Sequence, residues 1–194
     1  MRYMKKYPFL ILTVLLLIFN SAQAEEELKT LESIEVLTGY GWGELKYDKD
    51  YHLYPLIIDF DLNLKKLTSK IGFTPPMLMQ FQLETFISGV SQPHSNVEAG
   101  GGFALKIGIL PESFALQPYI KAGTGMLYMS QHTHAQGTQF NFYEYGGAGA
   151  HWFINKNIAL TAEYRFRHVS NAGLSERNGG INTSFALAGI SYRF

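Results

Sequence analysis

The sequence contains no cysteine among its 194 residues. This absence excludes disulfide bonds, thiol catalysis and a lipid-modified N-terminal cysteine. Whatever fold the chain adopts must therefore be stabilised without covalent cross-links.

Long hydrophobic runs are also scarce, and the clearest one lies near the N-terminus, from Phe9 to Phe19. Small residues at Ala22 and Ala24 follow it, and three basic residues precede it: Arg2, Lys5 and Lys6. This order is typical of a secretory signal peptide. We expect Sec export with removal of residues 1–24, which leaves residues 25–194 as one domain. An uncleaved anchor is the alternative.

Neither sign of charge dominates the rest of the chain. Removal of the leader leaves 13 basic and 16 acidic residues, a net charge of −3, and nothing in this balance favours binding of nucleic acid. No second apolar run is long enough for a transmembrane helix, which excludes a helical membrane protein. A soluble β-sandwich and a membrane β-barrel remain.

From Glu32 onward, apolar and polar residues alternate in eight segments separated by turn-like stretches. Such alternation indicates strands with two different faces, but it fits a sandwich as well as a barrel. Several segments alternate for about ten residues, which is longer than the usual globular strand and suits a tilted strand that crosses a bilayer. We therefore predict an all-β fold, an eight-stranded antiparallel transmembrane β-barrel in the bacterial outer membrane.

The polar and aromatic residues of these segments have expected places in a barrel. Charged residues on the polar face should form an ion-pair network in the lumen: Asp59, Asp61, Glu84, Glu98, Lys106 and Lys121. Aromatic residues near segment ends should form interfacial girdles: Tyr51, Tyr54, Tyr128, Tyr143, Tyr145 and Trp152. The terminal Phe194, with Tyr192 and Ile190 on the same face, resembles the assembly signal of outer-membrane barrels.

The last predicted hairpin places polar residues on its lipid-facing side. His168 and Ser170 continue the outward parity of one strand, and Asn182 shares the outward parity of the next. With a loop from Asn171 to about Gly179, His168 should lie opposite Asn182, with Cβ atoms about 5 Å apart. The simplest explanation of such residues is a rim wetted by lipid headgroups.

A longer motif gives these residues a more specific meaning. The string His168-Val169-Ser170-Asn171-Ala172-Gly173-Leu174 is followed by Asn178-Gly179-Gly180-Ile181, and the chain closes on Tyr192-Arg193-Phe194. Over about the last thirty residues, this pattern resembles the lipid A 3-O-deacylase family, the PagL-type or acyloxyacyl hydrolase-like outer-membrane esterases. The resemblance implies an eight-stranded barrel that hydrolyses the ester-linked acyl chain at position 3 of lipid A.

The resemblance also implies roles for individual residues. The nucleophile of the family falls on Ser170 and its general base on His168, and the oxyanion hole falls on the Asn171 side chain and the Gly173 backbone N–H. The chemistry is consistent, because a serine hydroxyl is a weak nucleophile until an adjacent imidazole takes its proton.

The third member of the triad departs from the family pattern. The family has a glutamate twelve residues after the serine, where this chain has Asn182. An amide can accept a hydrogen bond from the imidazole and orient it, but it gives the imidazolium no ionic support. Three outcomes stay open: Asn182 orients His168, Glu176 in the hairpin loop replaces it, or the protein is inactive.

The leading prediction is a serine esterase without cofactor or metal, whose partners are lipid A (lipopolysaccharide) and outer-membrane lipid; homodimer formation is left open. A non-enzymatic structural or adhesion barrel and a lipid A acyltransferase are the alternatives. His132, His134 and His94 are expected to be solvated loop residues, because no third metal ligand is visible beside them.

Overall fold

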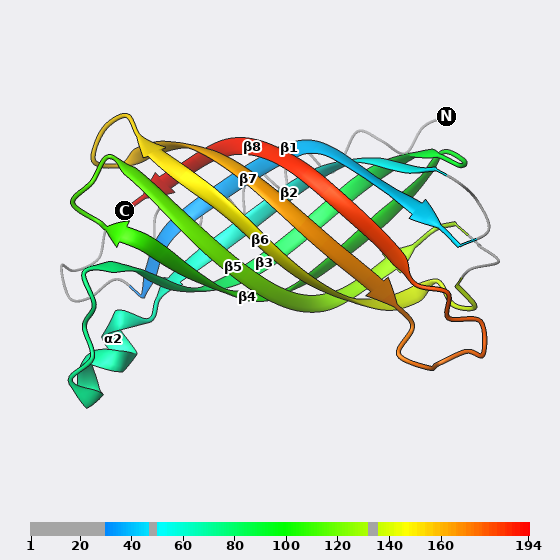
Figure 1. Ribbon diagram of the computed structural model, residues 1–194, viewed down its shortest axis with the longest axis horizontal. Coiled ribbons are helices and arrows are strands. Elements are labelled where there is room, and N and C mark those ends of the chain that lie inside the picture. Colours follow the sequence, from blue (N-terminus) through cyan, green and yellow to red (C-terminus); the bar gives the residue numbers. More distant parts are fainter. Residues whose placement is uncertain (1–29, 47–49, 132–135) are drawn as a thin grey trace, which may run out of the picture.

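The computed structural model describes residues 30–46, 50–131 and 136–194. The predicted signal peptide and the His132 and His134 pair lie outside these described residues. Eight antiparallel strands close into a barrel in chain order, as predicted (Figure 1). The strands are β1 (Leu31–Leu45), β2 (Tyr51–Asn63), β3 (Met77–Gln92), β4 (Asn96–Pro111), β5 (Leu116–Met129), β6 (Phe140–Phe153), β7 (Ile158–Ser170) and β8 (Ile181–Arg193).

The alternation in the sequence divides each strand between the outside and the lumen of the barrel. In β3, for example, Leu83 and Ile87 are exposed on the outer wall, whereas Gln82 and Glu84 are buried inside. An apolar exterior around a polar interior is the reverse of a soluble sandwich and is the arrangement of an outer-membrane barrel.

Buried ion pairs fill the lumen, as predicted. The ammonium of Lys106 lies 3.3 Å from Glu35 and 3.5 Å from Asp61. Arg165 lies 2.7 Å from a carboxylate oxygen of Glu84 and 2.8 Å from one of Glu163. These charges are shielded from water and compensate one another, so the interior is a packed polar core and not an open channel.

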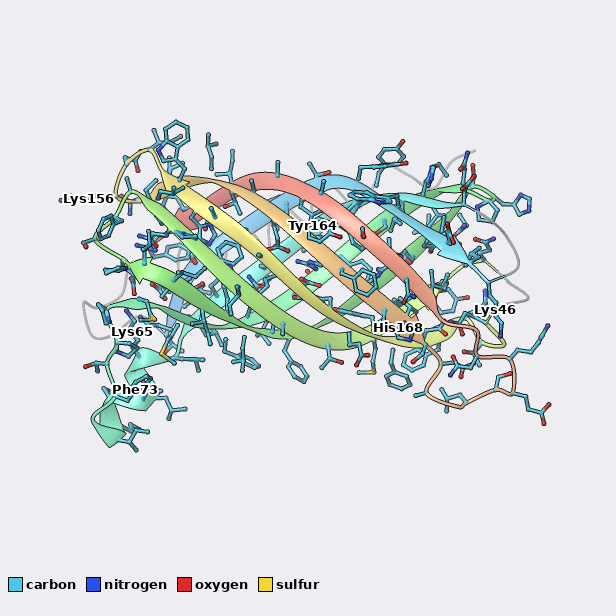
Figure 2. All side chains as sticks on the ribbon, viewed as in Figure 1. Lys46, Lys65, Phe73, Lys156, Tyr164 and His168 are labelled. Carbon is cyan, nitrogen blue, oxygen red and sulfur yellow. The ribbon has the colours of Figure 1, made fainter. Side chains whose placement is uncertain are left out.

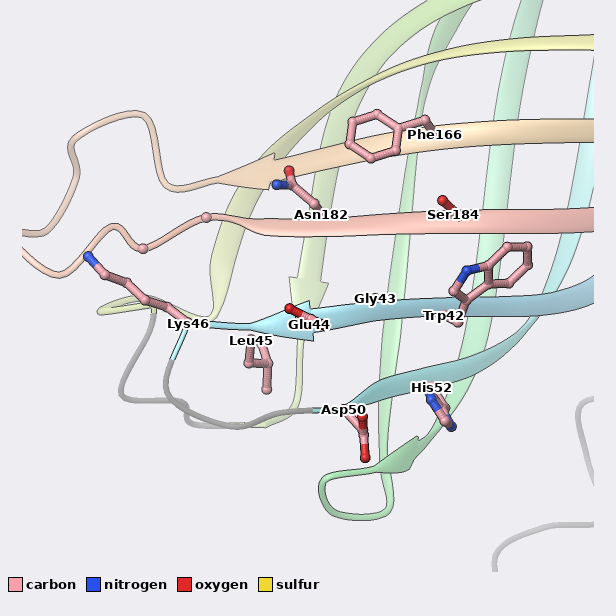
Figure 3. A pocket seen from close by; sticks show the side chains of 12 residues that line it. Trp42, Gly43, Glu44, Leu45, Lys46, Asp50, His52, Phe166, Asn182 and Ser184 are labelled. Atoms are coloured by element: carbon pink, nitrogen blue, oxygen red, sulfur yellow. The ribbon is translucent and has the colours of Figure 1, made fainter.

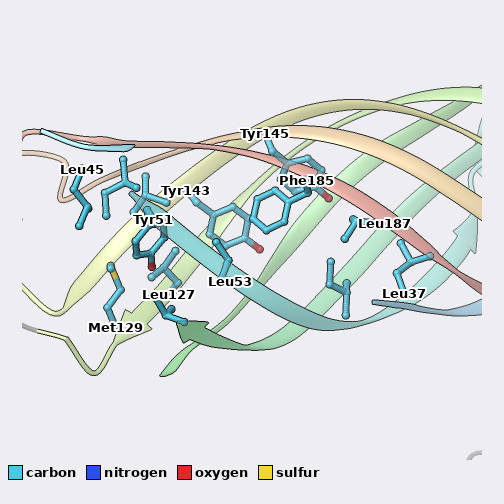
Figure 4. Packing of buried hydrophobic residues seen from close by; sticks show 14 of the residues in the cluster. Leu37, Leu45, Tyr51, Leu53, Leu127, Met129, Tyr143, Tyr145, Phe185 and Leu187 are labelled. Atoms are coloured by element: carbon cyan, nitrogen blue, oxygen red, sulfur yellow. The ribbon is translucent and has the colours of Figure 1, made fainter. Parts of the chain in front are cut away.

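A cluster of buried aliphatic and aromatic side chains also lies inside the barrel (Figure 4). It corrects the girdle prediction for Tyr51, Tyr143 and Tyr145, which are buried in the lumen. Their odd-numbered positions share the inward parity, and their hydroxyls find carboxylate partners there: the Tyr51 hydroxyl donates to Glu98 at 2.9 Å. The other three predicted girdle residues are exposed on the outer wall: Tyr54, Tyr128 and Trp152.

The two ends of the barrel carry different connections. Strands β1, β3, β5 and β7 end at the side of the barrel opposite the C-terminus, where residues 171–180 project beyond the strands (Figure 1). At the other end, α2 (Lys65–Thr68) and a short 3₁₀ turn (Ser69–Ile71) join β2 to β3. Within the described ranges, no helix has the length and apolar character needed to cross a membrane.

Candidate active site

His168 and Asn182 are direct partners across the pairing of β7 with β8, which confirms the predicted register. The Nδ1 atom of His168 lies 2.6 Å from the Oδ1 atom of Asn182. A carbonyl oxygen only accepts, so Nδ1 carries the hydrogen and donates it. This tautomer leaves a lone pair on Nε2, the form of imidazole that can act as a base.

Ser170 lies two residues beyond His168 and shares its outward face. The side chain is partly exposed, and within the described part of the chain its hydroxyl makes no hydrogen bond. Its partner residue on the neighbouring strand β6 is Phe142. The hydroxyl is therefore available to a molecule that approaches from the lipid side.

Gly180 leaves room for the imidazole of His168. The sequence pattern did not predict this role of Gly180. A Cβ atom at position 180 would lie 2.8 Å from Cε1 and 3.5 Å from Nε2 of His168. Gly180 also has a φ of +72°, a conformation that favours glycine. Glycine at position 180, directly before β8, therefore suits both the backbone conformation and the position of the His168 imidazole.

Asn171 organises the β7–β8 loop. Its side chain is fully buried; Nδ2 donates to the Arg177 carbonyl at 2.8 Å, and Oδ1 accepts from the Gly173 N–H at 3.0 Å. Its own backbone N–H donates to Asn178 Oδ1 at 2.9 Å. The two predicted oxyanion-hole donors lie one and three residues after Ser170, and both are hydrogen-bonded within the loop.

The structure also locates the carboxylates around the site. Glu176 is exposed in the loop and, within the described residues, makes no hydrogen bond or ion pair with His168. Glu163 faces the lumen, where Lys121 and Arg165 neutralise it. Among the described residues, neither carboxylate is hydrogen-bonded to His168, whose Nδ1 atom is engaged by Asn182.

Two other glutamates flank the His168 and Asn182 pair. Glu144 of β6 is the direct partner of His168, and Glu44 of β1 is the direct partner of Asn182. Both are exposed on the outer wall. Four polar side chains therefore form a row across β6, β7, β8 and β1. A sequence signal for Glu144 existed, because it interrupts the outward apolar parity of Phe140 and Phe142.

Two grooves on the outer wall meet at this row. The first, of about 550 Å³, is mainly apolar and contains His168 and Glu144; its remaining outward side chains are Phe103, Leu105, Ala122, Thr124 and Phe166, with Gly146 beside them. The second, of about 670 Å³, is more polar and includes Trp42, Glu44, His52, Asn182 and Ser184 (Figure 3). Phe166 lines both grooves.

The site lies near the end of the barrel that carries the β7–β8 loop (Figure 2). Tyr164, further along the same strand, lies toward the middle of the wall. Among the residues that the structure describes, no three His, Cys, Asp or Glu side chains form a group able to hold a metal ion.

Fold and site together define the class of protein: an outer-membrane β-barrel with a serine, a histidine and a carboxamide on its lipid-facing wall. The family model described as "Lipid A 3-O-deacylase (PagL)" matches residues 60–191. The chain therefore belongs to the lipid A 3-O-deacylase (PagL) family.

Solved structures agree with this fold. The crystal structure of the outer membrane enzyme PagL is 18% identical, with a TM-score of 0.62, over 80% of this chain and 97% of that one. Neisserial surface protein A is 10% identical, with a TM-score of 0.57, over 84% of this chain and 96% of that one. The N-terminal β-barrel domain of Pseudomonas aeruginosa OprF is 15% identical, with a TM-score of 0.50, over 84% of this chain and 98% of that one. Among curated protein sequences, none matches significantly.

Proposed function

We propose that this protein is a lipid A 3-O-deacylase of the outer membrane, a carboxylic ester hydrolase that removes the 3-O-linked acyl chain. The 2.6 Å bond between His168 and Asn182, beside the unengaged hydroxyl of Ser170, carries the proposal. These groups face lipid and not the lumen, which favours a substrate embedded in the membrane. Membership of the lipid A 3-O-deacylase (PagL) family supports lipid A as that substrate.

Ser170 is the nucleophile and His168 the general base. The Ser170 oxygen attacks the ester carbonyl carbon while His168 Nε2 takes the hydroxyl proton, which gives a tetrahedral oxyanion and an imidazolium. The carbon–oxygen bond to the sugar then breaks, and the imidazolium returns the proton to the leaving sugar oxygen. Water attacks the acyl-serine by the same route, releasing the fatty acid and restoring Ser170.

Asn182 is the third member in this proposal, because it already holds the Nδ1 hydrogen of His168. The orienting function of a triad acid is thereby retained, since the imidazole is fixed in the tautomer that can take a proton from serine. Glu176 has no such contact with His168 within the described residues.

Asn171 and Gly173 are the proposed oxyanion donors. Oxyanion stabilisation requires N–H groups that point at the developing charge. The second hydrogen on Asn171 Nδ2 is one candidate, and the Gly173 N–H becomes another when it leaves Asn171 Oδ1. Binding of substrate would therefore adjust the loop around residues 171–173.

The apolar groove is the proposed site of the scissile acyl chain. It combines aromatic walls at Phe103 and Phe166 with small residues at Ala122 and Gly146, and it leads to His168. Such a groove removes the hydrocarbon chain from contact with neighbouring lipids and brings its ester to His168, two residues from the nucleophile on the same face of β7.

The proposal for localisation includes Sec export, cleavage after Ala24 and insertion of the barrel into the outer membrane with a periplasmic N-terminus. Strand β7 then rises toward the extracellular side, which puts the site at the level of the outer leaflet, where lipid A is embedded.

Mass spectrometry of lipid A from cells that express wild type or Ser170→Ala tests the function. We expect the wild type alone to remove one ester-linked hydroxyacyl chain. An unchanged profile in both, with heat-modifiable electrophoretic mobility showing that both barrels are folded, favours a structural barrel. A gain of one acyl chain favours an acyltransferase.

A further inference from the structure

We infer that Glu144 is a positioning residue that supplies the negative charge missing from Asn182, so that two residues share the work of the triad acid. Asn182 holds the Nδ1 hydrogen, and Glu144 stabilises the imidazolium electrostatically from the other side. The inference rests on the proposed function of His168 as the general base.

The register of the sheet places Glu144 where this role requires it. His168 pairs with Asn182 on β8 and with Glu144 on β6, so the amide and the carboxylate flank the imidazole from opposite sides. Directly opposite side chains on the same face have Cβ atoms about 5 Å apart. Glu144 and His168 also line the same apolar groove.

Glu144 is the charged side chain directly opposite His168 on a neighbouring strand, and the other charges near His168 are paired elsewhere or lie further along the sheet or in loops. On β7 itself, Arg165 and Arg167 face the lumen and are paired there with Glu84 and Glu98. On the β8 side the neighbour is the neutral Asn182, and Glu44 of β1 lies one strand further away. The β7–β8 loop carries two exposed charged side chains, Glu176 and Arg177, and the β1–β2 connection carries Lys46 and Asp50.

A carboxylate beside His168 acts without touching the imidazole. Charge–charge attraction decreases with distance but needs no hydrogen bond, and it strengthens where lipid lowers the local dielectric constant. The imidazolium forms only after His168 has taken the proton of Ser170. Glu144 therefore stabilises the charged intermediate more than the resting enzyme, which is the condition for a catalytic benefit.

Titration of the His168 imidazole by nuclear magnetic resonance in detergent micelles tests the inference independently of activity. We expect the midpoint to lie lower in Glu144→Gln than in wild type, by about half a pH unit or more, because loss of the nearby anion disfavours the imidazolium. Glu144→Asp should stay closer to wild type. Glu44→Gln, one strand further from His168, should shift the midpoint less.

Equal midpoints in wild type and Glu144→Gln would overturn the inference, as would a larger shift in Glu44→Gln than in Glu144→Gln. This result can be obtained even if the wild type and Ser170→Ala both leave lipid A intact. Failure of the proposed function is thus distinguishable from failure of the role of Glu144.

Kinetics gives the second test. Glu144→Gln should lower kcat by about tenfold or more with a smaller change in KM, and it should move the acid limb of the pH–rate profile to lower pH. Addition of Asn182→Glu to Glu144→Gln should restore the rate, because the anion returns on the other flank. An active Glu144→Gln variant with unchanged kcat and acid limb contradicts the inference and leaves the deacylase proposal intact.

Discussion

Gly180 lies so close to His168 that an added methyl group would meet the imidazole 2.8 Å from Cε1. Gly180→Ala should therefore displace His168 from Ser170 and lower deacylation by about tenfold or more, since small misplacements of catalytic groups carry large penalties in rate. The rate constant of purified, folded protein on lipid A in micelles measures this effect.

Gly72→Ala is the matched control for backbone strain. Gly72 has a φ of +75°, similar to the +72° of Gly180, but open space surrounds it near the other end of the barrel. Both variants should lose stability through backbone strain, Gly180→Ala the more because its methyl group also meets His168, and only Gly180→Ala should lose activity. Equal activity in the two variants would show that the imidazole tolerates the methyl group.

Gly146→Leu should obstruct the proposed acyl groove. No atom lies within 4 Å of a Cβ built at this outward position, so the larger side chain fits the fold and projects into the groove. We expect deacylation of long-chain lipid A to fall by about tenfold or more, with less loss for substrates with shorter 3-O chains.

Gly89→Leu provides the control for that substitution. Gly89 is also outward-facing and open, but it lies on β3 and outside both grooves. Its activity should match wild type with every chain length. If Gly146→Leu behaves in the same way, the acyl chain lies elsewhere.

Substitutions of Asn182 should separate two effects on His168: the orientation of its imidazole by a hydrogen-bond acceptor, and the stabilisation of its imidazolium by a negative charge. Asn182→Ala removes the acceptor of the His168 Nδ1 hydrogen and should lower kcat by about a hundredfold or more, since loss of the correct tautomer in a serine-protease triad lowers kcat by about 10⁴-fold. Asn182→Glu restores both acceptor and charge and should equal or exceed the wild-type rate. A slower Asn182→Glu enzyme would show that the site is adapted to the amide. Steady-state kinetics on the purified variants decides between these results.

The lumenal network should control stability. Arg165→Ala leaves Glu84 and Glu163 without their guanidinium partner and should reduce the free energy of unfolding by about 3 kcal/mol or more. Lys65→Ala, which removes a more exposed ion pair with Glu112, should reduce it by less than about 1 kcal/mol. Urea unfolding in micelles measures both; similar losses would argue against a structural role for the buried network.

The sequence allowed prediction of features that depend on parity within one hairpin. The period-two alternation gave the outward faces of β7 and β8, and a short loop fixed their register, so the pairing of His168 with Asn182 could be predicted. The loop assignment and the motif placed Ser170, Asn171 and Gly173 next to this pair.

Features set by other strands could not be predicted in the same way. Glu144 becomes a neighbour of His168 only through the register of β6 against β7, which depends on where the connection at residues 154–157 ends each strand. The girdle prediction failed for Tyr51, Tyr143 and Tyr145 because parity, and not closeness to a strand end, decides which face an aromatic occupies. The space that Gly180 gives His168 depends on three-dimensional contact that a sequence pattern does not contain.

The most direct measurement of the central claim is the release of free 3-hydroxy fatty acid from lipid A by the purified, folded barrel, with wild type and Ser170→Ala compared at equal concentration. The account predicts release of one 3-O-linked chain per 3-O-acylated lipid A molecule by the wild type and none above background by Ser170→Ala. Equal release by both proteins, or no release by a correctly folded wild type, would contradict it.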